Sequence, residues 1–310
     1  MTSWPELPFR EWRDTCETLH LWTQVVGKIR LACTPWLNHS WHVPLYVTTR
    51  GLTTSAIPHR GRYFEILLDF CAQELIIDVS DGCRQRLALQ SGSIADFHAA
   101  VLEALQRLDL QVAINPLPSE IPDARRFTED HAARAYNPMH AQRFWQALLQ
   151  IDRVLREFRT GFLGKASPVH FFWGSFDLAV SRFSGRRAPP FQGKAPGLSA
   201  AVMREAYSHE VSSAGFWPGG HGIDYPAFYS YVYPTPAAFR DWPVSPQGAR
   251  FSEELGEFLL PYDDVRTATD PDAILLAFLQ STYEAAAQTG HWDRATLECA
   301  RGVPGVPRPL

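Results

Sequence analysis

Three segments of the sequence concentrate the side chains that could carry out chemistry. They read NHSWHVPLYVTTRG (38–51), SPVHFFWGSFDLAVSRFSGR (167–186) and REAYSHEVSSAGFWPGG (204–220). Together the segments are dense in His, Trp, Arg, Ser and, in the second and third, acidic residues, where purely structural strands would be mostly aliphatic. We therefore expect the functional site to be built from these three segments.

The residue types predict acid–base chemistry on a small molecule, because His and carboxylate side chains exchange protons near neutral pH. The candidate catalytic residues are His42, His170, Asp177, His209 and Glu210. The candidate substrate-binding residues are Trp41, Arg50, Trp173, Arg182 and Trp217. If the arginines line a common cleft, they favour a small anionic substrate.

A metal-assisted mechanism is an alternative of similar weight. Imidazole and carboxylate ligands suit Fe, Mn or Zn, provided that the three segments converge. The ligands would be His42, His170 and His209, with one carboxylate from Glu205, Glu210 or Asp177. Competing structural interpretations stay open for each residue. Asp177 could form a buried ion pair with Arg182 or Arg186, and His209 and Glu210 would point to opposite faces of a strand.

Composition and motifs exclude several classes of protein. The 310 residues contain 29 Lys and Arg against 33 Asp and Glu, which lacks the basic excess typical of nucleic-acid binding. No nucleotide-binding glycine motif, H-E-x-x-H, G-x-S-x-G or C-x-x-C is present, so no nucleotide cofactor is expected. No apolar stretch is long enough to span a membrane. The amino terminus does not resemble a secretory signal, and the five cysteines are widely spaced, so we expect a cytoplasmic protein with reduced thiols.

Hydrophobic periodicity predicts the elements that position these segments. Apolar residues at steps of three and four indicate amphipathic helices over 11–33, 93–109, 138–162 and 271–290. Alternating and β-branched runs indicate strands over 41–49, 84–89, 169–183, 207–216, 227–233 and 257–262, and two strands within 62–79 with a break near 72–74. The prediction is an α+β fold of two similar halves, 1–115 and 138–300, each an antiparallel sheet backed by long helices. A connection (116–137) joins the halves, and 301–310 is expected to be a flexible tail.

The two halves share an order of elements, which raises the hypothesis of an internal duplication. A long helix, Gly-Lys, a His-led strand and further strands precede a closing helix in both halves, although few residues are identical. A pseudo-twofold would bring the strands that begin at His42 and His170 together. A cleft between the halves is then the expected place for the site.

The motifs also resemble a known family. Together with LHLWTQVVGKIRL (19–31), the stretches WHVPLYVTTRGLTTS, KASPVHFFWGSFDLAVSRF and REAYSHEVSSAGFWPGG resemble a bacterial family known only as a domain of unknown function. The resemblance extends from about Trp4 to Trp292. It implies a stand-alone bacterial protein of this size and brings no activity. His221 departs from the family pattern, whereas the pattern is matched by His20, His39, His42, His170, Asp177, His209 and Glu210.

The sequence therefore predicts a cytoplasmic enzyme that acts on a small, anionic metabolite between two halves, by acid–base or metal-assisted chemistry. The alternative from another class is a non-catalytic protein that holds a ligand or a partner in the same segments. That alternative predicts a closed, charge-paired cluster with no cavity beside His42, His170 and His209. The oligomeric state is not readable from the sequence.

Overall fold

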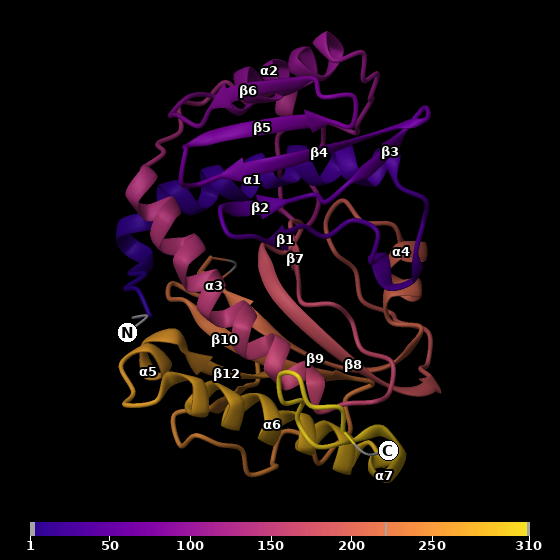
Figure 1. Ribbon diagram of the computed structural model, residues 1–310. Coiled ribbons are helices and arrows are strands. Elements are labelled where there is room, and N and C mark those ends of the chain that lie inside the picture. Colours follow the sequence, from indigo (N-terminus) through magenta and orange to yellow (C-terminus); the bar gives the residue numbers. More distant parts are fainter. Residues whose placement is uncertain (1–3, 221, 309–310) are drawn as a thin grey trace.

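The computed structural model of the protein describes residues 4–220 and 222–308. The chain folds into two antiparallel sheets of six strands each, backed by helices (Figure 1). Seven α-helices lie within these residues. The predicted α+β class is confirmed. In the described part of the chain, no helix is both long and apolar enough to cross a membrane.

The first sheet is a meander between two helices. Helix α1 (Phe9–Cys33) precedes it and α2 (Ile94–Arg107) follows it. The strands are β1 (Tyr46–Val47), β2 (Gly51–Thr53), β3 (Ile57–His59), β4 (Arg62–Asp69), β5 (Glu74–Val79) and β6 (Arg84–Ala88). They pair in the order β1-β2-β4-β5-β6, with β3 paired to β4. Helix α2 begins where predicted, because the Ser93 side chain accepts a hydrogen bond from the Asp96 backbone N–H.

The second sheet follows the long helix α3 (Pro138–Thr160), which begins at the predicted position, directly after its Asn137 cap. Its strands are β7 (His170–Phe172), β8 (Asp177–Arg187), β9 (His209–Trp217), β10 (Ala227–Tyr233), β11 (Arg250–Ser252) and β12 (Glu257–Pro261). Their order is β11-β12-β10-β9-β8-β7. The remaining helices are α4 (Ala200–Ala206), α5 (Tyr262–Arg266), α6 (Pro271–Thr289) and α7 (Arg294–Leu297).

The two parts share one hydrophobic core. Buried residues of α1 and the first sheet belong to the same apolar cluster as those of α3, α6 and the second sheet. The two sheets also meet at one backbone bridge, where Leu45 and Phe171 exchange hydrogen bonds of 2.8 Å in both directions. The strand orders differ between the sheets, so the structure gives no support to the internal duplication.

Two predicted strands take a different form in the structure. The run 169–183 is divided by a turn at 173–176, which reverses the chain between β7 and β8. The strand expected to begin near His42 is a short 3-10 helix (Asn38–Ser40) and a turn, and only Tyr46–Val47 is extended. Strand propensity was overridden here because this loop must cross from α1 to the edge of the first sheet.

The second sheet has two chemically different faces. Along β8, Leu178, Val180 and Arg182 point toward the helices, and Arg182 lies against the rings of Phe158 in α3 and Tyr283 in α6. Alternation places Asp177, Ala179, Ser181 and Phe183 on the opposite face. All four of these residues line a cavity on that face.

The fully buried amide of Gln24 in α1 ties the two parts to the connection. Its Nε2 donates to the carbonyl oxygens of Ser119, at 2.7 Å, and Trp173, at 3.2 Å. Its Oε1 accepts the backbone N–H of Ser119 at 2.9 Å. One side chain therefore holds the connection at Ser119 and the turn between β7 and β8 against the first helix.

We predict that Gln24→Leu lowers the free energy of unfolding by about 2–3 kcal/mol, because the buried N–H and carbonyl of Ser119 lose their partner. Urea denaturation measures the change. The control is Gln106→Leu, on the exposed face of α2. Equal stability of the two variants would contradict this role of Gln24.

Candidate functional site

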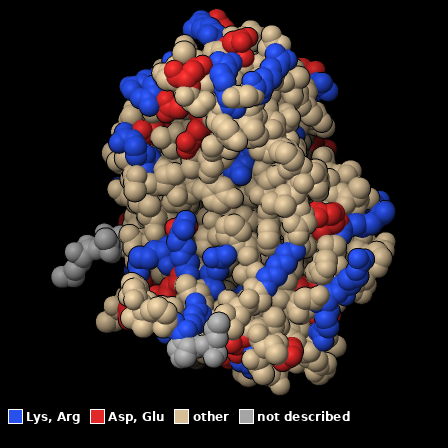
Figure 2. Space-filling view, turned by 45° about the vertical axis from the view of Figure 1, so that its right-hand side comes forward, with Lys and Arg blue, Asp and Glu red and all other residues tan. Residues whose placement is uncertain are grey.

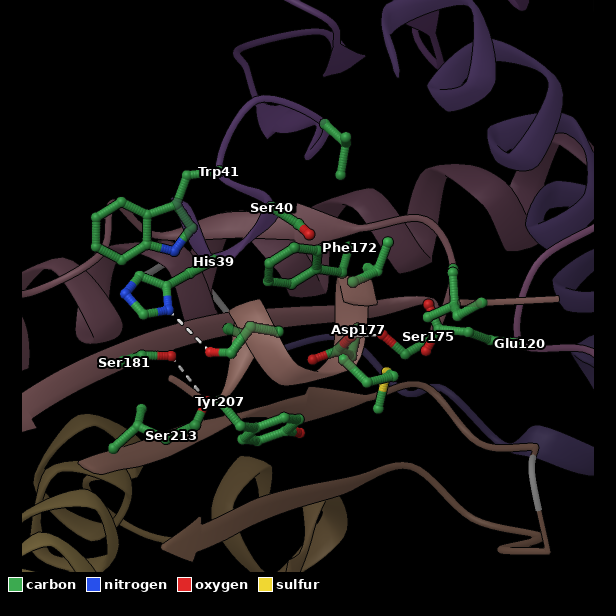
Figure 3. A pocket seen from close by; sticks show the side chains of 18 of the residues that line it. His39, Ser40, Trp41, Glu120, Phe172, Ser175, Asp177, Ser181, Tyr207 and Ser213 are labelled. Carbon is green, nitrogen blue, oxygen red and sulfur yellow. Dashed lines mark hydrogen bonds between the residues drawn. The ribbon is translucent and has the colours of Figure 1, made fainter. Parts of the chain in front are cut away.

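A cavity of about 330 Å³ lies over the face of the second sheet that points away from α3 and α6, beneath the loop that follows α1 (Figure 3). Strands β8, β9, β10 and β12 contribute its floor, and helix α4 and the connection at residues 119–120 contribute its sides. The loop residues His39 and Trp41 close it from above. Small residues hollow the floor, where the Ser181 and Ser213 hydroxyls share a hydrogen bond of 2.9 Å.

Asp177 is the best-anchored carboxylate of the cavity. Its side chain accepts hydrogen bonds from the hydroxyls of Ser175 and Tyr229. Tyr229 can cross β9 to reach it because Gly215 has no Cβ, and a Cβ there would lie 2.6 Å from the tyrosine hydroxyl. Burial raises the pKa of Asp177 to about 6, against the opposing effect of the two hydroxyl donors.

Glu120 enters the cavity from the connection. It has a φ of +63°, and its backbone N–H donates to the Pro196 carbonyl at 2.6 Å. Its carboxyl lies against Gly174, where a Cβ would collide with it. No hydrogen bond to this carboxyl is formed within the described residues. Burial, together with the neighbouring Asp177, raises the pKa of Glu120 to about 7.

Glu257, at the start of β12, is the third carboxyl that lines the cavity. It is only 5% exposed, and its carboxyl has no hydrogen-bond or ion-pair partner in the described part of the chain. Burial, with a smaller contribution from Asp177, raises its pKa to about 8. A carboxyl that is buried without a partner is costly to ionise, so it is expected at a binding site rather than in a structural core.

Three tyrosines lie among these carboxyls. The hydroxyls of Tyr207 and Tyr231 are 3.2 Å apart, and the Tyr229 hydroxyl is bound to Asp177. Tyr207 follows α4, whereas the other two lie on one face of β10. We call this set the carboxyl–tyrosine cluster, which comprises Glu120, Asp177, Tyr207, Tyr229, Tyr231 and Glu257.

His39 fastens α4 over the other end of the cavity. Its Nδ1 lies 2.8 Å from the Ala206 carbonyl, so this nitrogen carries the proton, and its Nε2 accepts a hydrogen bond of 2.6 Å from Lys165. The His39 backbone N–H donates to the Glu205 carboxylate. Burial lowers the pKa of His39, which favours this neutral ring. Both His39 and Ser40 have a φ of +58°, a strained conformation for residues other than glycine.

The structure places three of the predicted substrate-binding residues on this cavity. Trp41, Trp173 and Trp217 all line it. The indole N–H of Trp173 donates to the Val43 carbonyl at 2.9 Å, which fixes the ring between the two parts. Trp217 packs on Tyr229 with ring centroids 5.0 Å apart.

The predicted histidines do not meet at one site. His42 accepts the Leu37 N–H at 3.2 Å and packs on Trp36, and it is not among the residues that line the cavity. His170 is fully buried beside Phe172, and burial lowers its pKa to about 3. His209 contacts the edge of the His39 ring at 5.9 Å between centroids.

Within residues 4–220 and 222–308, no three His, Cys, Asp or Glu side chains are grouped to hold a metal ion. The predicted metal ligands His42, His170 and His209 are thus not brought together. His221 lies outside the described residues.

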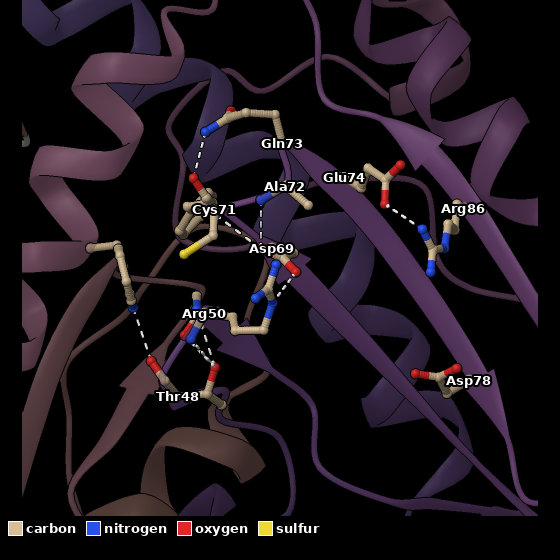
Figure 4. A network of polar contacts seen from close by, with 12 residues as sticks. Thr48, Arg50, Asp69, Cys71, Ala72, Gln73, Glu74, Asp78 and Arg86 are labelled. Carbon is tan, nitrogen blue, oxygen red and sulfur yellow. Dashed lines mark hydrogen bonds and ion pairs between the residues drawn. The ribbon is translucent and has the colours of Figure 1, made fainter.

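The remaining predicted residues lie away from the cavity. Arg182 is on the helix-facing side of β8, and Glu210 pairs with Arg186 at 2.7 Å on the same side. Arg50 belongs to the turn between β1 and β2 and pairs with Asp69 at the end of β4 (Figure 4). Strand alternation explains the position of Arg182. It lies five positions after Asp177, and an odd step along a strand places two side chains on opposite faces.

The comparison with protein families agrees with the resemblance of the motifs. A family profile matches residues 4–299 of the chain. The chain belongs to DUF5996, a family of unknown function. No curated protein and no solved structure matches it.

Several cavity residues of this DUF5996 member escaped the sequence analysis. Glu120 lies in the connection, which has no periodic pattern, and Glu257 was read only as the start of a strand. A signal existed for Tyr229 and Tyr231, because alternation within AFYSYVY places them on one face. No local pattern identifies Glu120, since its position depends on the Gln24 contact with Ser119.

A second cavity, of about 890 Å³, lies on the other side of Glu120. It is bounded by α1 and the connection, and Glu120 lines both cavities.

On the molecular face that carries α4, few charged side chains occupy the middle, whereas Lys, Arg, Asp and Glu gather toward both ends (Figure 2).

We predict that Glu257→Gln stabilises the protein at pH 8. Glu257 keeps its proton up to about pH 8 in the folded state, whereas its unperturbed pKa is 4.5. The folded state therefore binds more protons between these values, and its stability falls as the pH rises. Removing this carboxylic acid should raise the free energy of unfolding at pH 8 by up to about 1.4 kcal/mol for each pH unit between the two pKa values, with much less change at pH 5.

Denaturation at the two pH values measures the effect of Glu257→Gln. Glu254→Gln, in the exposed turn before β12, is the control and should show no such difference between pH 5 and pH 8. A Glu257→Gln variant that is less stable than the wild type at pH 8 would show that the carboxylate is compensated in the folded protein.

Proposed function

We propose that the protein is an enzyme that performs acid–base chemistry on a small molecule in the cavity, with Asp177 and Glu120 as the proton-transferring pair. The observation that carries this proposal is the placement of two carboxyls in one cavity with opposite surroundings. Asp177 accepts two hydroxyl hydrogen bonds, which favour its carboxylate form. Glu120 accepts none, which favours its acid form.

The pKa values of the two groups support different roles. Burial raises the pKa of both carboxyls, but two hydroxyl donors oppose this effect at Asp177, whereas the neighbouring Asp177 adds to it at Glu120. Asp177 is therefore assigned as the proton acceptor and Glu120 as the proton donor. In the proposed reaction, the ligand gives one proton to Asp177 and receives one from Glu120. The net charge of the pair is then unchanged, and the two carboxyls must exchange a proton with water before the next turnover.

The second cavity supports a route for that exchange. Glu120 lines both cavities, so a proton can reach it from the second cavity while a ligand occupies the first.

Strained backbone supports the same location for the site, because Glu120, His39 and Ser40 all have positive φ and all line the first cavity. Strain of this kind is retained mainly where a binding or catalytic geometry requires it.

This proposal keeps the sequence-based idea of a small-molecule enzyme between the two parts and changes the residues. The histidines His42, His170 and His209, the carboxylate Glu210 and the arginines Arg50 and Arg182 have no role in it. Of the predicted residues, Asp177, Trp41, Trp173 and Trp217 remain.

We predict that Asp177→Asn and Glu120→Gln each lower turnover by about a hundredfold or more, which is the usual contribution of a positioned proton-transferring group. The assay incubates purified protein with a pooled bacterial metabolite extract and follows substrate loss and product gain by mass spectrometry. Asp109→Asn, an exposed carboxylate beyond α2, is the control and should keep wild-type turnover.

Each variant is checked for folding by circular dichroism, so that a lost activity is not a lost fold. Wild-type turnover that persists in both Asp177→Asn and Glu120→Gln would overturn the assignment of the pair. A wild-type protein that converts no compound in the extract would overturn the enzyme proposal in favour of a non-catalytic binding protein.

A further inference from the structure

We propose that the ligand of this cavity is an organic ammonium compound, with its charged nitrogen in the carboxyl–tyrosine cluster and an apolar body beneath α4. This inference rests on the proposed function, since it names the substrate class of the same site. The arginines of the motifs led us to expect an anionic substrate, whereas the cavity favours a cationic one.

The balance of charge in the cavity is the first argument. Three carboxyls line it, and among the described residues no Lys or Arg does. Two ammonium groups that contact lining residues are already engaged: Lys28 donates to the Ser119 hydroxyl at 3.0 Å, and Lys165 donates to His39. Neither forms an ion pair with Glu120, Asp177 or Glu257. A ligand cation would supply the missing counter-charge and favour the ionised forms of Asp177 and Glu257.

The unpartnered carboxyl of Glu257 is the second argument. Glu257 is only 5% exposed, and within the described residues its carboxyl lines the cavity without a hydrogen bond. A group in this state needs a donor from the ligand to recover its desolvation cost. An anionic ligand offers no such donor and would add repulsion.

The shape of the acidic cluster selects an organic cation over a metal ion. In the described residues the three carboxyls are not grouped closely enough to ligate one metal. An ammonium with N–H donors can instead bond to separate carboxylates and to tyrosine hydroxyls, all of which accept hydrogen bonds. The aromatic rings of Trp217 and Tyr229 border the same region and add cation–π attraction.

Apolar side chains in the lining fit an apolar body. They are Ala179, Phe183, Leu198, Val202, Met203 and Val211, and they line the cavity together with the polar Ser181, Ser213 and His39. Two of the apolar residues, Val202 and Met203, lie on α4, which His39 holds over the sheet. An aryl- or alkyl-substituted amine therefore matches both the carboxyls and the apolar side chains, whereas a fully polar cation matches only the carboxyls.

A matched set of probes tests the substrate class. Isothermal titration at pH 8 compares 2-phenylethylamine with 2-phenylethanol and phenylacetate, which share the ring and differ in the charge of the head group. We expect the amine to bind at least about tenfold more tightly than the alcohol, and phenylacetate not to bind. Glu257→Gln should weaken amine binding at least about tenfold, and the control Glu254→Gln should not.

The outcomes separate this inference from the proposed function. Equal or tighter binding of the alcohol or the acid overturns the cationic class, as does an absence of amine binding. If the metabolite assay then yields a neutral or anionic substrate whose turnover needs Asp177, the proposed function stands and only the substrate class is wrong. If neither amine binding nor turnover is found, both proposals fail. Amine binding without turnover supports the ligand class and refutes the enzyme.

Discussion

The amide of Gln24 is the contact on which the rest of this structure depends. From the middle of α1 it binds Ser119 through two hydrogen bonds and the Trp173 carbonyl through a third. Ser119 precedes Glu120, and Trp173 begins the turn that leads to Asp177. The same buried side chain therefore joins the two parts of the fold and sets the relative position of the two carboxyls.

The carboxyls proposed to bind and react with the ligand also lower the stability of the folded protein. Glu120 is half-buried and Glu257 is buried, and neither carboxyl has a donor among the described residues. Their raised pKa values mean that the folded state is disfavoured when they ionise. Such a cost is tolerated because the surrounding core is continuous through both parts. A ligand that supplies donors and positive charge would lower that cost, so binding and stability are linked at this site.

Local patterns were sufficient for the long helices and insufficient for the site. Hydrophobic periodicity predicted α1, α2, α3 and α6 closely, because that signal is contained within one element. The turn at 173–176 was missed because its flanks are equally rich in aromatic residues, so residues 169–183 were predicted as one strand. Glu120 could not be found at all, since an irregular segment acquires its position from a distant helix.

The arginines show why the charge of a ligand is hard to infer from the composition of a motif. Arg182 lies five residues after Asp177 in the same segment, and alternation sends it to the opposite face, where it contacts Phe158 and Tyr283. Arg50 and Arg186 are engaged by Asp69 and Glu210. With these cations directed elsewhere, the carboxyls that remain on the cavity face have no counter-charge from the described chain. The sign of the ligand follows from which face each charge occupies, and only the strand register determines that.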